Sequence, residues 1–259
     1  MESILKKTIK SGNASAVVLP KAWLNKRVKV EVVEKTKQEI LYDVLDIVKS
    51  KIDSSEIIGV YLVGSYARKE EEKISDIDIL IITEKKDLEI IKDNNYEILT
   101  VSLSLLNYKL RESLFPIGTM LKEAVPLLNS KFLKDIKIEV TRKNIKWFLD
   151  ITKKSLKLVK DSINRIEKKK PQGLLSDAVA YSLILSLRTI YMINCLKNKK
   201  LYTKSEFIQL IIKISGSKTA YDRYIYAKNN EKNKRKLPLI EGKMLYQYLK
   251  DYFNLSNGE

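Results

Sequence analysis

Histidine is absent from this sequence of 259 residues, and cysteine occurs once. Without histidine, the chain has no Ser-His-Asp or Cys-His nucleophile, no histidine general base and no His-ligated zinc site. The single Cys195 cannot form a disulfide within the chain, and its place in an apolar helical pattern predicts a buried core residue. The groups that remain for catalysis are carboxylates, lysines, tyrosines and metal ions.

Long apolar runs are missing as well. The sequence has no stretch of eighteen or more apolar residues, so we expect no membrane span. Residues 1–7 lack the apolar core of a secretory signal, and we therefore expect a cytoplasmic protein. Apolar residues make up 44% of the chain, which at this length predicts two or three globular domains.

Acidic residues are too few to balance the basic ones: 32 stand against 49, which leaves a net charge of +17. Such a charge favours an anionic partner, and nucleic acid is the partner that we weigh. The candidate phosphate contacts are Lys10, Lys26 and Arg27. The alternative is a lysine-rich, solvated surface around an enzyme that acts on something else.

Two carboxylates stand beside a turn of small residues. The apolar run Ile57–Val63 predicts a buried strand, the turn Gly64–Arg68 follows it, and a second apolar run covers Ile77–Thr83. Residues two apart on a strand point to the same face, so Asp76 and Asp78 project together. Such a pair repels unless a cation or a proton joins it, and hard divalent cations fit it well. The alternative is an exposed edge on which both carboxylates only increase solubility.

The residues that carry this pattern are Gly64-Ser65-x-Ala67-Arg68-Lys69, five further residues, and Ser75-Asp76-x-Asp78-Ile79. The pattern resembles the signature of the DNA polymerase β-like nucleotidyltransferases, especially the minimal and kanamycin-type members. Lys69 replaces the usual second glycine, which changes the turn geometry if that position needs a positive φ. The resemblance implies metal-dependent transfer of a nucleoside monophosphate from a nucleoside triphosphate, ATP by expectation, to an acceptor.

The resemblance also implies roles for individual residues. Asp76 and Asp78 would hold two Mg²⁺ ions, and Glu97 on the next strand would supply the third, catalytic carboxylate. An exposed strand glutamate with no role is the alternative for Glu97. The residues implied to bind the nucleotide and its phosphates are Gly64, Ser65, Arg68 and Ser75. Arg68 is also expected to be structural or a charge anchor near the turn.

We predict an α+β fold in three parts: residues 1–34, 35–142 and 143–259. The first part has a turn at residues 11–13, a short strand at 16–19 that Pro20 ends, and an alternating strand at 27–32. It resembles the AbrB/SpoVT-type swapped hairpin, which implies a homodimer and DNA binding. The alternative is a small β appendage of the next domain.

The second part is predicted to be the α/β nucleotidyltransferase domain. It has a helix at 40–52, strands at 57–63, 77–83 and 96–103, and a short helix within 84–93. The third part is predicted to be a bundle of five helices, at residues 145–166, 174–196, 205–214, 221–228 and 241–253.

The bundle is similar to those of kanamycin-type enzymes and of HEPN proteins, but two functional signals are missing. No histidine follows Arg188, so a HEPN-type ribonuclease is not supported. Residues 185–189 offer no glutamate where the kanamycin-type enzymes place their base, so aminoglycoside modification is not supported either. The basic stretch 228–236 is either a solvated linker or the rim of a nucleotide or RNA site.

Two classes of function follow. The first is a metal-dependent nucleotidyltransferase whose acceptor is a protein, an RNA or a small molecule. The second is a DNA-binding regulator or antitoxin-like protein whose nucleotidyltransferase domain senses nucleotide or controls a partner.

Overall fold

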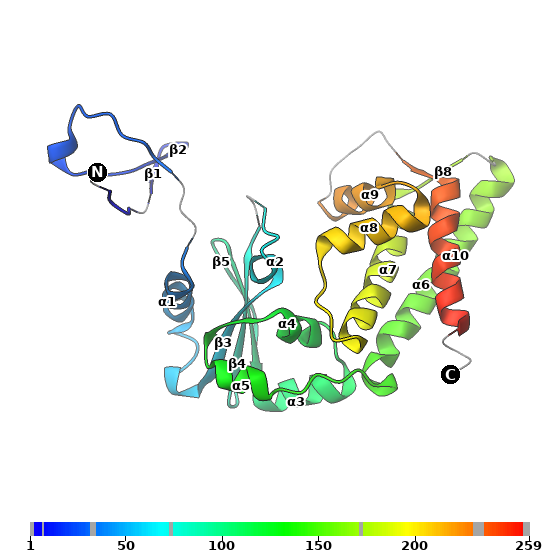
Figure 1. Cartoon of the computed structure of the whole chain (residues 1–259), viewed down its shortest axis with the longest axis horizontal. Helices are drawn as coiled ribbons and strands as arrows, with labels where there is room; N and C mark the ends of the chain where they lie inside the picture. The colour runs from blue at the N-terminus through cyan, green and yellow to red at the C-terminus, as the bar shows by residue number, and fades with distance from the viewer. Residues whose placement is uncertain are drawn as a thin grey trace. The chain divides into compact units, whose positions relative to one another are not determined.

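The computed structural model describes residues 3–6, 8–31, 35–72, 75–170, 173–229 and 236–255. The chain divides into two units, Met1–Thr36 and Lys37–Glu259, and each unit is considered by itself (Figure 1). This division separates a small N-terminal module from the rest of the chain.

The N-terminal unit is built on a short β-hairpin. Strands β1 (Ile9–Ser11) and β2 (Ala14–Ala16) pair around Gly12, whose φ of 59° confirms the predicted turn. A 3-10 helix, η1 (Lys21–Trp23), follows Pro20. The strand predicted at 16–19 is wrong, because β2 ends at Ala16.

The alternating segment at 27–32 is also corrected. Its described residues, 27–31, form no regular element, and Val32 lies outside the described residues. A strand needs a partner to satisfy its backbone groups, and the described part of the unit pairs no segment with it. The likeness to a swapped hairpin therefore remains a prediction.

A five-stranded sheet forms the centre of the first half of the large unit, in the order β5-β6-β4-β3-β7. Its strands are β3 (Ile57–Val63), β4 (Ile77–Thr83), β5 (Leu88–Asp93), β6 (Tyr96–Ser102) and β7 (Val125–Leu128). The pair β4–β6 is parallel and the other pairs are antiparallel, so the sheet is mixed.

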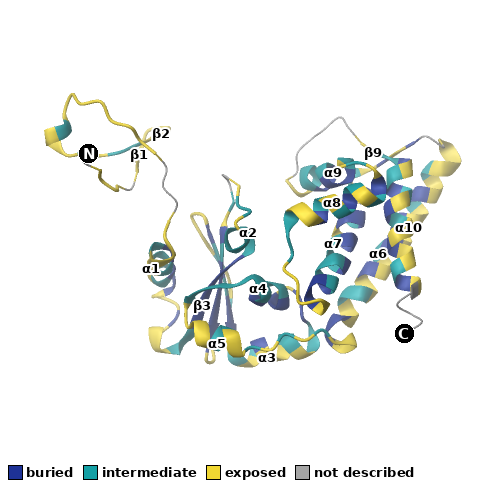
Figure 2. Cartoon of the chain, in the orientation of Figure 1, coloured by how far each residue is buried: buried dark blue, intermediate teal, exposed yellow. Residues whose placement is uncertain are grey.

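The central strands of the sheet are buried (Figure 2). Their alternating side chains form an apolar core on each face of the sheet. On one face, Val60 and Ile79 pack with α1 (Lys37–Val48). On the other, Leu80 and Val101 pack with α3 and α4. The helices of the second face are α3 (Leu103–Glu112), α4 (Ile117–Glu123) and α5 (Ser130–Asp135). The one-turn helix α2 (Gly64–Arg68) links β3 to the segment before β4.

The helix predicted within 84–93 is wrong, since β5 occupies Leu88–Asp93 as an edge strand. It pairs with β6 across the two-residue turn Asn94-Asn95, and Asn94 has a φ of 49°. Asparagine tolerates this left-handed conformation, and such two-residue loops are typical of hairpins.

The five predicted helices of the C-terminal region are confirmed. They are α6 (Arg142–Lys169), α7 (Asp177–Lys197), α8 (Lys204–Ser215), α9 (Thr219–Lys228) and α10 (Leu239–Leu255). Two short strands, β8 (Leu174–Leu175) and β9 (Leu237–Pro238), pair at one end of the bundle. With the sheet, this helical region confirms the predicted α+β class.

Helix α7 is the central helix of the bundle. Among the described residues it is the one helix long and apolar enough to span a membrane by composition, but 56% of its apolar window is buried in the protein. Leu183, Ile184 and Leu187 are fully buried against the other helices. Its apolar composition is therefore that of a core helix.

A small apolar cluster joins the sheet to the bundle. Leu114 and Phe115, after α3, pack with Ile193 and Leu196 of α7. Beside them, the buried Asn144 amide donates to the carbonyl oxygens of Leu110 (2.7 Å) and Glu139 (2.9 Å). This junction places the bundle against the side of the sheet where the candidate site lies.

Candidate functional site

A cleft of about 1000 Å³ lies between the sheet and the bundle. Its sheet wall carries the charged residues Arg68, Glu70, Glu72, Asp76, Asp78, Lys92, Glu97, Lys122 and Glu123. Its bundle wall carries Arg188, Lys200, Tyr202, Lys204, Phe207, Lys218, Tyr221, Asp222, Tyr224, Tyr226 and Lys228. Among these described residues, the sheet wall is mainly acidic, and the bundle wall is basic and aromatic.

Strand register brings the three predicted carboxylates to the sheet wall. Asp76 directly precedes β4 and Asp78 is its second residue, so both project to one face. Asp78 lies opposite Glu97 in the parallel pair β4–β6, where neighbouring strands are about 4.8 Å apart. The structure thus places Asp76, Asp78 and Glu97 together along the cleft.

The turn after β3 approaches Asp78 so closely that only glycine fits at its first position. Gly64 has a φ of +69°, and a Cβ atom there would lie 1.9 Å from Asp78 Oδ2. Lys69 ends α2 with a φ of 57°, in the left-handed region. The lysine therefore adopts the conformation for which a glycine is usual, and the turn forms despite the replacement.

Negative charge accumulates at Asp78. Burial raises its pKa to about 6, the carboxylates of Glu97, Asp76 and Glu123 act in the same direction, and Arg68 opposes them. A carboxylate in this environment gains from a bound cation or proton. The site thus has the electrostatic character of an incomplete cation site.

The donor set fits a hard divalent cation in chemistry, because carboxylate oxygens are the ligands that Mg²⁺ prefers. Glu97 is already paired, with its Oε2 atom 2.6 Å from Lys92 Nζ. Within the described ranges, no three acidic, histidine or cysteine side chains are grouped closely enough to hold a metal. A cation here would bind Asp76 and Asp78 and take further oxygen ligands from a phosphate.

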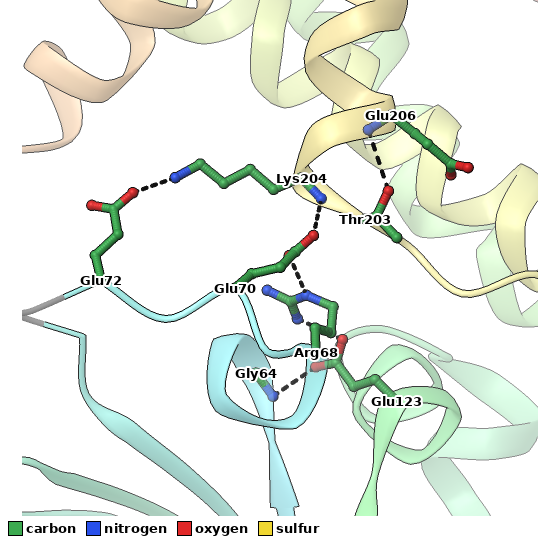
Figure 3. A network of polar contacts seen from close by, with 8 residues as sticks. All are labelled: Gly64, Arg68, Glu70, Glu72, Glu123, Thr203, Lys204 and Glu206. Carbon is green, nitrogen blue, oxygen red and sulfur yellow. Dashed lines mark hydrogen bonds and ion pairs between the residues drawn. The ribbon is translucent and has the colours of Figure 1, made fainter. Parts of the chain in front are cut away.

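A partly buried polar network holds the turn (Figure 3). The Gly64 amide donates to Glu123 Oε1 (2.8 Å), and Arg68 Nη1 donates to Glu123 Oε2 (2.6 Å). Arg68 Nε donates to Glu70 Oε2 (2.9 Å). The amide predicted to bind phosphate is thus engaged by Glu123. Sequence reasoning missed Glu123 because it lies 59 residues from Gly64 and belongs to no local motif.

The bundle wall places a second guanidinium near the first. Arg68 and Arg188 both lie over the ring of Tyr202, at 5.3 and 5.4 Å from its centroid. Arg188 Nη1 donates to the Tyr224 hydroxyl at 3.5 Å, a long hydrogen bond. Its buried Nε has no hydrogen-bond partner among the described residues. Arg68 is paired with two carboxylates, whereas Arg188 contacts rings and a hydroxyl.

The remaining predicted residues separate into two groups. Ser65 and Ser75 line the cleft, and Ser75 Oγ accepts a hydrogen bond from the Glu72 amide (2.8 Å). Lys10, Lys26 and Arg27 are exposed and belong to the N-terminal unit, Met1–Thr36. The structure therefore brings the nucleotide-site candidates together within the large unit.

The solved structures that overlap with this chain include two distant ones. One is spectinomycin adenyltransferase AAD(9) from Enterococcus faecialis, solved with ATP and spectinomycin, at 12% identity and a TM-score of 0.39. That overlap covers 81% of this chain and 98% of the other. The second is a nucleotidyltransferase-like protein from Exiguobacterium sibiricum, also at 12% identity, with a TM-score of 0.37 and coverage of 82% and 73%. Overlaps this weak carry no argument about this chain.

Among curated proteins, no sequence matches the chain significantly. A model of the nucleotidyltransferase domain matches residues 41–185, which is more than half of the 259-residue chain. The match covers the Gly64 turn, both aspartates, Glu97 and Glu123. The chain therefore belongs to the nucleotidyltransferase domain family.

Proposed function

We propose that the protein transfers a nucleoside monophosphate from a nucleoside triphosphate, ATP by preference, to an acceptor in the cleft. The observation that carries this proposal is the adjacency of Asp76 and Asp78 to the Gly64 turn in a cleft of about 1000 Å³. That volume lies at the upper end of the usual range for small-molecule sites. Family membership supports the reaction type.

Each wall has its own part in the proposed reaction. Asp76 and Asp78 would hold Mg²⁺, two ions by expectation, which neutralises phosphate charge and orients the leaving pyrophosphate. Glu97 lies next to Asp78 and would orient the acceptor, releasing Lys92 when it does so. Ser65 and Ser75 lie at the rim of the turn and would donate hydroxyl hydrogen bonds to phosphate oxygens. Gly64 would join them only after its amide leaves Glu123.

Arg188 completes the proposed phosphate site from the other wall. Its guanidinium faces the cleft, and no ion pair with a carboxylate is seen for it among the described residues. A guanidinium recognises phosphate through planar, charge-assisted hydrogen bonds. The proposed occupant of this position is a phosphate of the bound nucleotide.

The charge of the bundle wall restricts the acceptor. In the described lining, five cations stand on this wall beside a single carboxylate, Asp222, which itself pairs with Lys218 at 3.2 Å. A polycationic acceptor would meet like charge there. We therefore favour an acceptor that is neutral or anionic.

The test is incubation of the chain with Mg²⁺, each of the four labelled nucleoside triphosphates and a cell extract as the source of acceptors. The proposal expects a labelled product that appears only with Mg²⁺. The Asp76→Asn variant should form no labelled product and should retain the circular dichroism spectrum of the parent. Labelling by the variant at the parent rate would refute the assignment.

A second candidate function rests on the N-terminal unit. For so small a unit, it exposes several large apolar side chains: Leu5 (68%), Val18 (63%), Leu24 (72%) and Val30 (66%). Lone units of this size bury too little to be stable, so we infer that a second copy of the chain covers these residues and forms a DNA-binding dimer. Deleting residues 1–36 should halve the mass measured by light scattering. It should also remove salt-sensitive retention of duplex DNA on filters.

A further inference from the structure

The two walls of the cleft are joined by polar contacts as well as by the apolar junction. Glu70 lies on the sheet wall, directly after the turn, and its Oε1 atom accepts a hydrogen bond from the backbone amide of Lys204 (2.7 Å). Lys204 is the first residue of α8 and lies 134 residues further along the chain. Figure 3 shows this contact between the turn and the start of α8.

Glu70 is also part of the network that holds the turn. Its other oxygen accepts from Arg68, which in turn pairs with Glu123, the acceptor of the Gly64 amide. The side chains are 15%, 17% and 10% exposed for Arg68, Glu70 and Glu123, so solvent screens their charges only in part. A continuous series of hydrogen bonds therefore runs from Gly64, beside Asp78, to the first amide of α8.

Helix α8 does not depend on Glu70 for a cap. Thr203 is its N-cap residue, and the Thr203 hydroxyl accepts a hydrogen bond from the Glu206 amide (3.2 Å). This local cap satisfies one of the free amides at the start of the helix, and Glu70 satisfies another from a distant segment. The hydrogen bond from the Lys204 amide to Glu70 thus connects two distant segments, because the helix already has its own N-cap.

Tyr202, the residue before Thr203, indicates what the hydrogen bond between Lys204 and Glu70 positions. Tyr202 contacts both guanidinium groups, one from each wall of the cleft. Glu70 fixes the segment that follows Tyr202, and Arg68 contacts both Glu70 and the ring. The ring that both guanidinium groups contact thus lies directly before the segment that Glu70 holds.

We propose that Glu70 is a positioning residue for nucleotidyl transfer. It sets the start of α8, and through Tyr202 the bundle wall, relative to the Gly64 turn and Asp78. The proposal rests on the function proposed above, because it concerns the geometry of the same site. Loss of Glu70 leaves the apolar junction at Leu114 intact, so we expect a misplaced wall in a folded protein.

The experiment compares three variants of the full chain: Glu70→Ala, Glu70→Gln and the matched control Thr203→Ala. Each alanine variant removes one acceptor at the start of α8, but only the first removes the hydrogen bond that joins α8 to the network of the turn. The ion pair between Glu72 and Lys204, which also joins the two walls, remains in all three variants. Hydrogen exchange of the segment 201–207 reports the Lys204 amide. Calorimetry with Mg²⁺ and α,β-methylene-ATP reports nucleotide binding, and label transfer at saturating triphosphate reports the reaction.

Glu70→Ala should lose protection at the start of α8 and transfer label about tenfold to a hundredfold more slowly, the usual effect of misplacing a reacting group. Thr203→Ala should lower the melting temperature about as much as Glu70→Ala does. It should nevertheless transfer label near the parent rate. Glu70→Gln should be intermediate, because its amide oxygen still accepts from Lys204 but no longer neutralises Arg68.

The proposal is overturned if Glu70→Ala transfers label at the parent rate, or if Thr203→Ala slows transfer as much as Glu70→Ala. A parent chain that neither binds α,β-methylene-ATP nor transfers label instead refutes the proposed function. The two failures are therefore distinguishable in one set of measurements.

Discussion

Arg68 and Arg188 lie over the same tyrosine ring, Tyr202. The two walls to which they belong differ in whether the arginine is paired with carboxylates. On the sheet wall, Arg68 is neutralised by Glu70 and Glu123, and the uncompensated charge is the acidic pair. On the bundle wall, the guanidinium of Arg188 contacts a hydroxyl and a ring. Among the described residues, neither Arg188 nor the pair of Asp76 and Asp78 forms an ion pair, although Arg188 acts on Glu123 and Arg68 acts on Asp78 through their charges. On the function proposed above, a metal-bound triphosphate would bring a cation to the aspartates and phosphate charge to Arg188.

The strongest way to break this comparison is to remove the acidic pair. The double variant Asp76→Asn, Asp78→Asn should reduce Mg²⁺-dependent transfer by about a thousandfold or more, because phosphoryl chemistry depends chiefly on charge stabilisation. Label transfer from each triphosphate measures the loss. Glu89→Gln, an exposed carboxylate of edge strand β5, is the control and should keep the parent rate. Transfer by the double variant would place the metal elsewhere.

Removing Glu97 tests the third carboxylate of the same wall. Glu97→Gln keeps the size of the side chain but weakens its hold on Lys92 and on an acceptor hydroxyl. Transfer should fall about tenfold to a thousandfold with little change in the affinity for α,β-methylene-ATP, the pattern of a group that assists the reaction more than binding. A loss confined to nucleotide affinity would assign Glu97 to the nucleotide instead.

Changing Arg188 tests the opposite wall. Arg188→Gln should weaken binding of Mg²⁺ and α,β-methylene-ATP about tenfold, since a charge-assisted hydrogen bond contributes about 1.5–3 kcal/mol. Arg188→Lys should recover part of the loss, because lysine keeps the charge without the planar fork. Arg165→Gln, an exposed arginine of α6, is the matched control. Unchanged affinity in Arg188→Gln would leave this guanidinium without a role in nucleotide binding.

Stability gives the smallest effect and has the opposite sign. The pKa of Asp78 is about 6 in the folded chain, above the ordinary 3.8, so the folded state holds this proton more tightly than the unfolded state. Its contribution to stability is therefore full below pH about 4 and is lost as the pH rises through about 6. At pH 7.5 without metal, Asp78→Asn should raise the free energy of unfolding by about 1 kcal/mol, after allowance for solvent screening.

Urea denaturation with a chelator at pH 7.5 and at pH 4 measures this difference, which should shrink at the lower pH. Added Mg²⁺ and nucleotide should stabilise the parent more than the variant, since only the parent keeps both ligands. A variant less stable than the parent at pH 7.5 would show that the aspartate supports the fold.

The acidic side of the site was predictable because it is local in sequence. Spacing along a strand placed Asp76 and Asp78 together. Glu97 was expected from the family resemblance, and the register of β4 with β6 sets it opposite Asp78. The turn at Gly64 was predictable for the same reason. The five bundle helices were predictable from apolar periodicity, since each has a buried face.

The distant partners of the turn and of the segment after it were not predictable in this way. Glu123 lies 59 residues from its partner Gly64, and Lys204 lies 134 residues from its partner Glu70. No local sequence pattern indicates contacts at such separations. The β5 strand was missed because its charged residues outweighed the asparagine turn that marks a hairpin. The N-terminal alternation was overread, because a pattern of period two specifies a strand only where a partner exists.

The contact between Glu70 and Lys204 has a consequence for synthesis of the protein. A ribosome adding about 5–20 residues per second completes the Gly64 turn on the order of ten seconds before it adds the segment that supports it. During that interval the nascent chain carries both aspartates and their glycine turn but no bundle wall. On the function proposed above, nucleotidyl transfer would begin only once α8 has folded, late in translation.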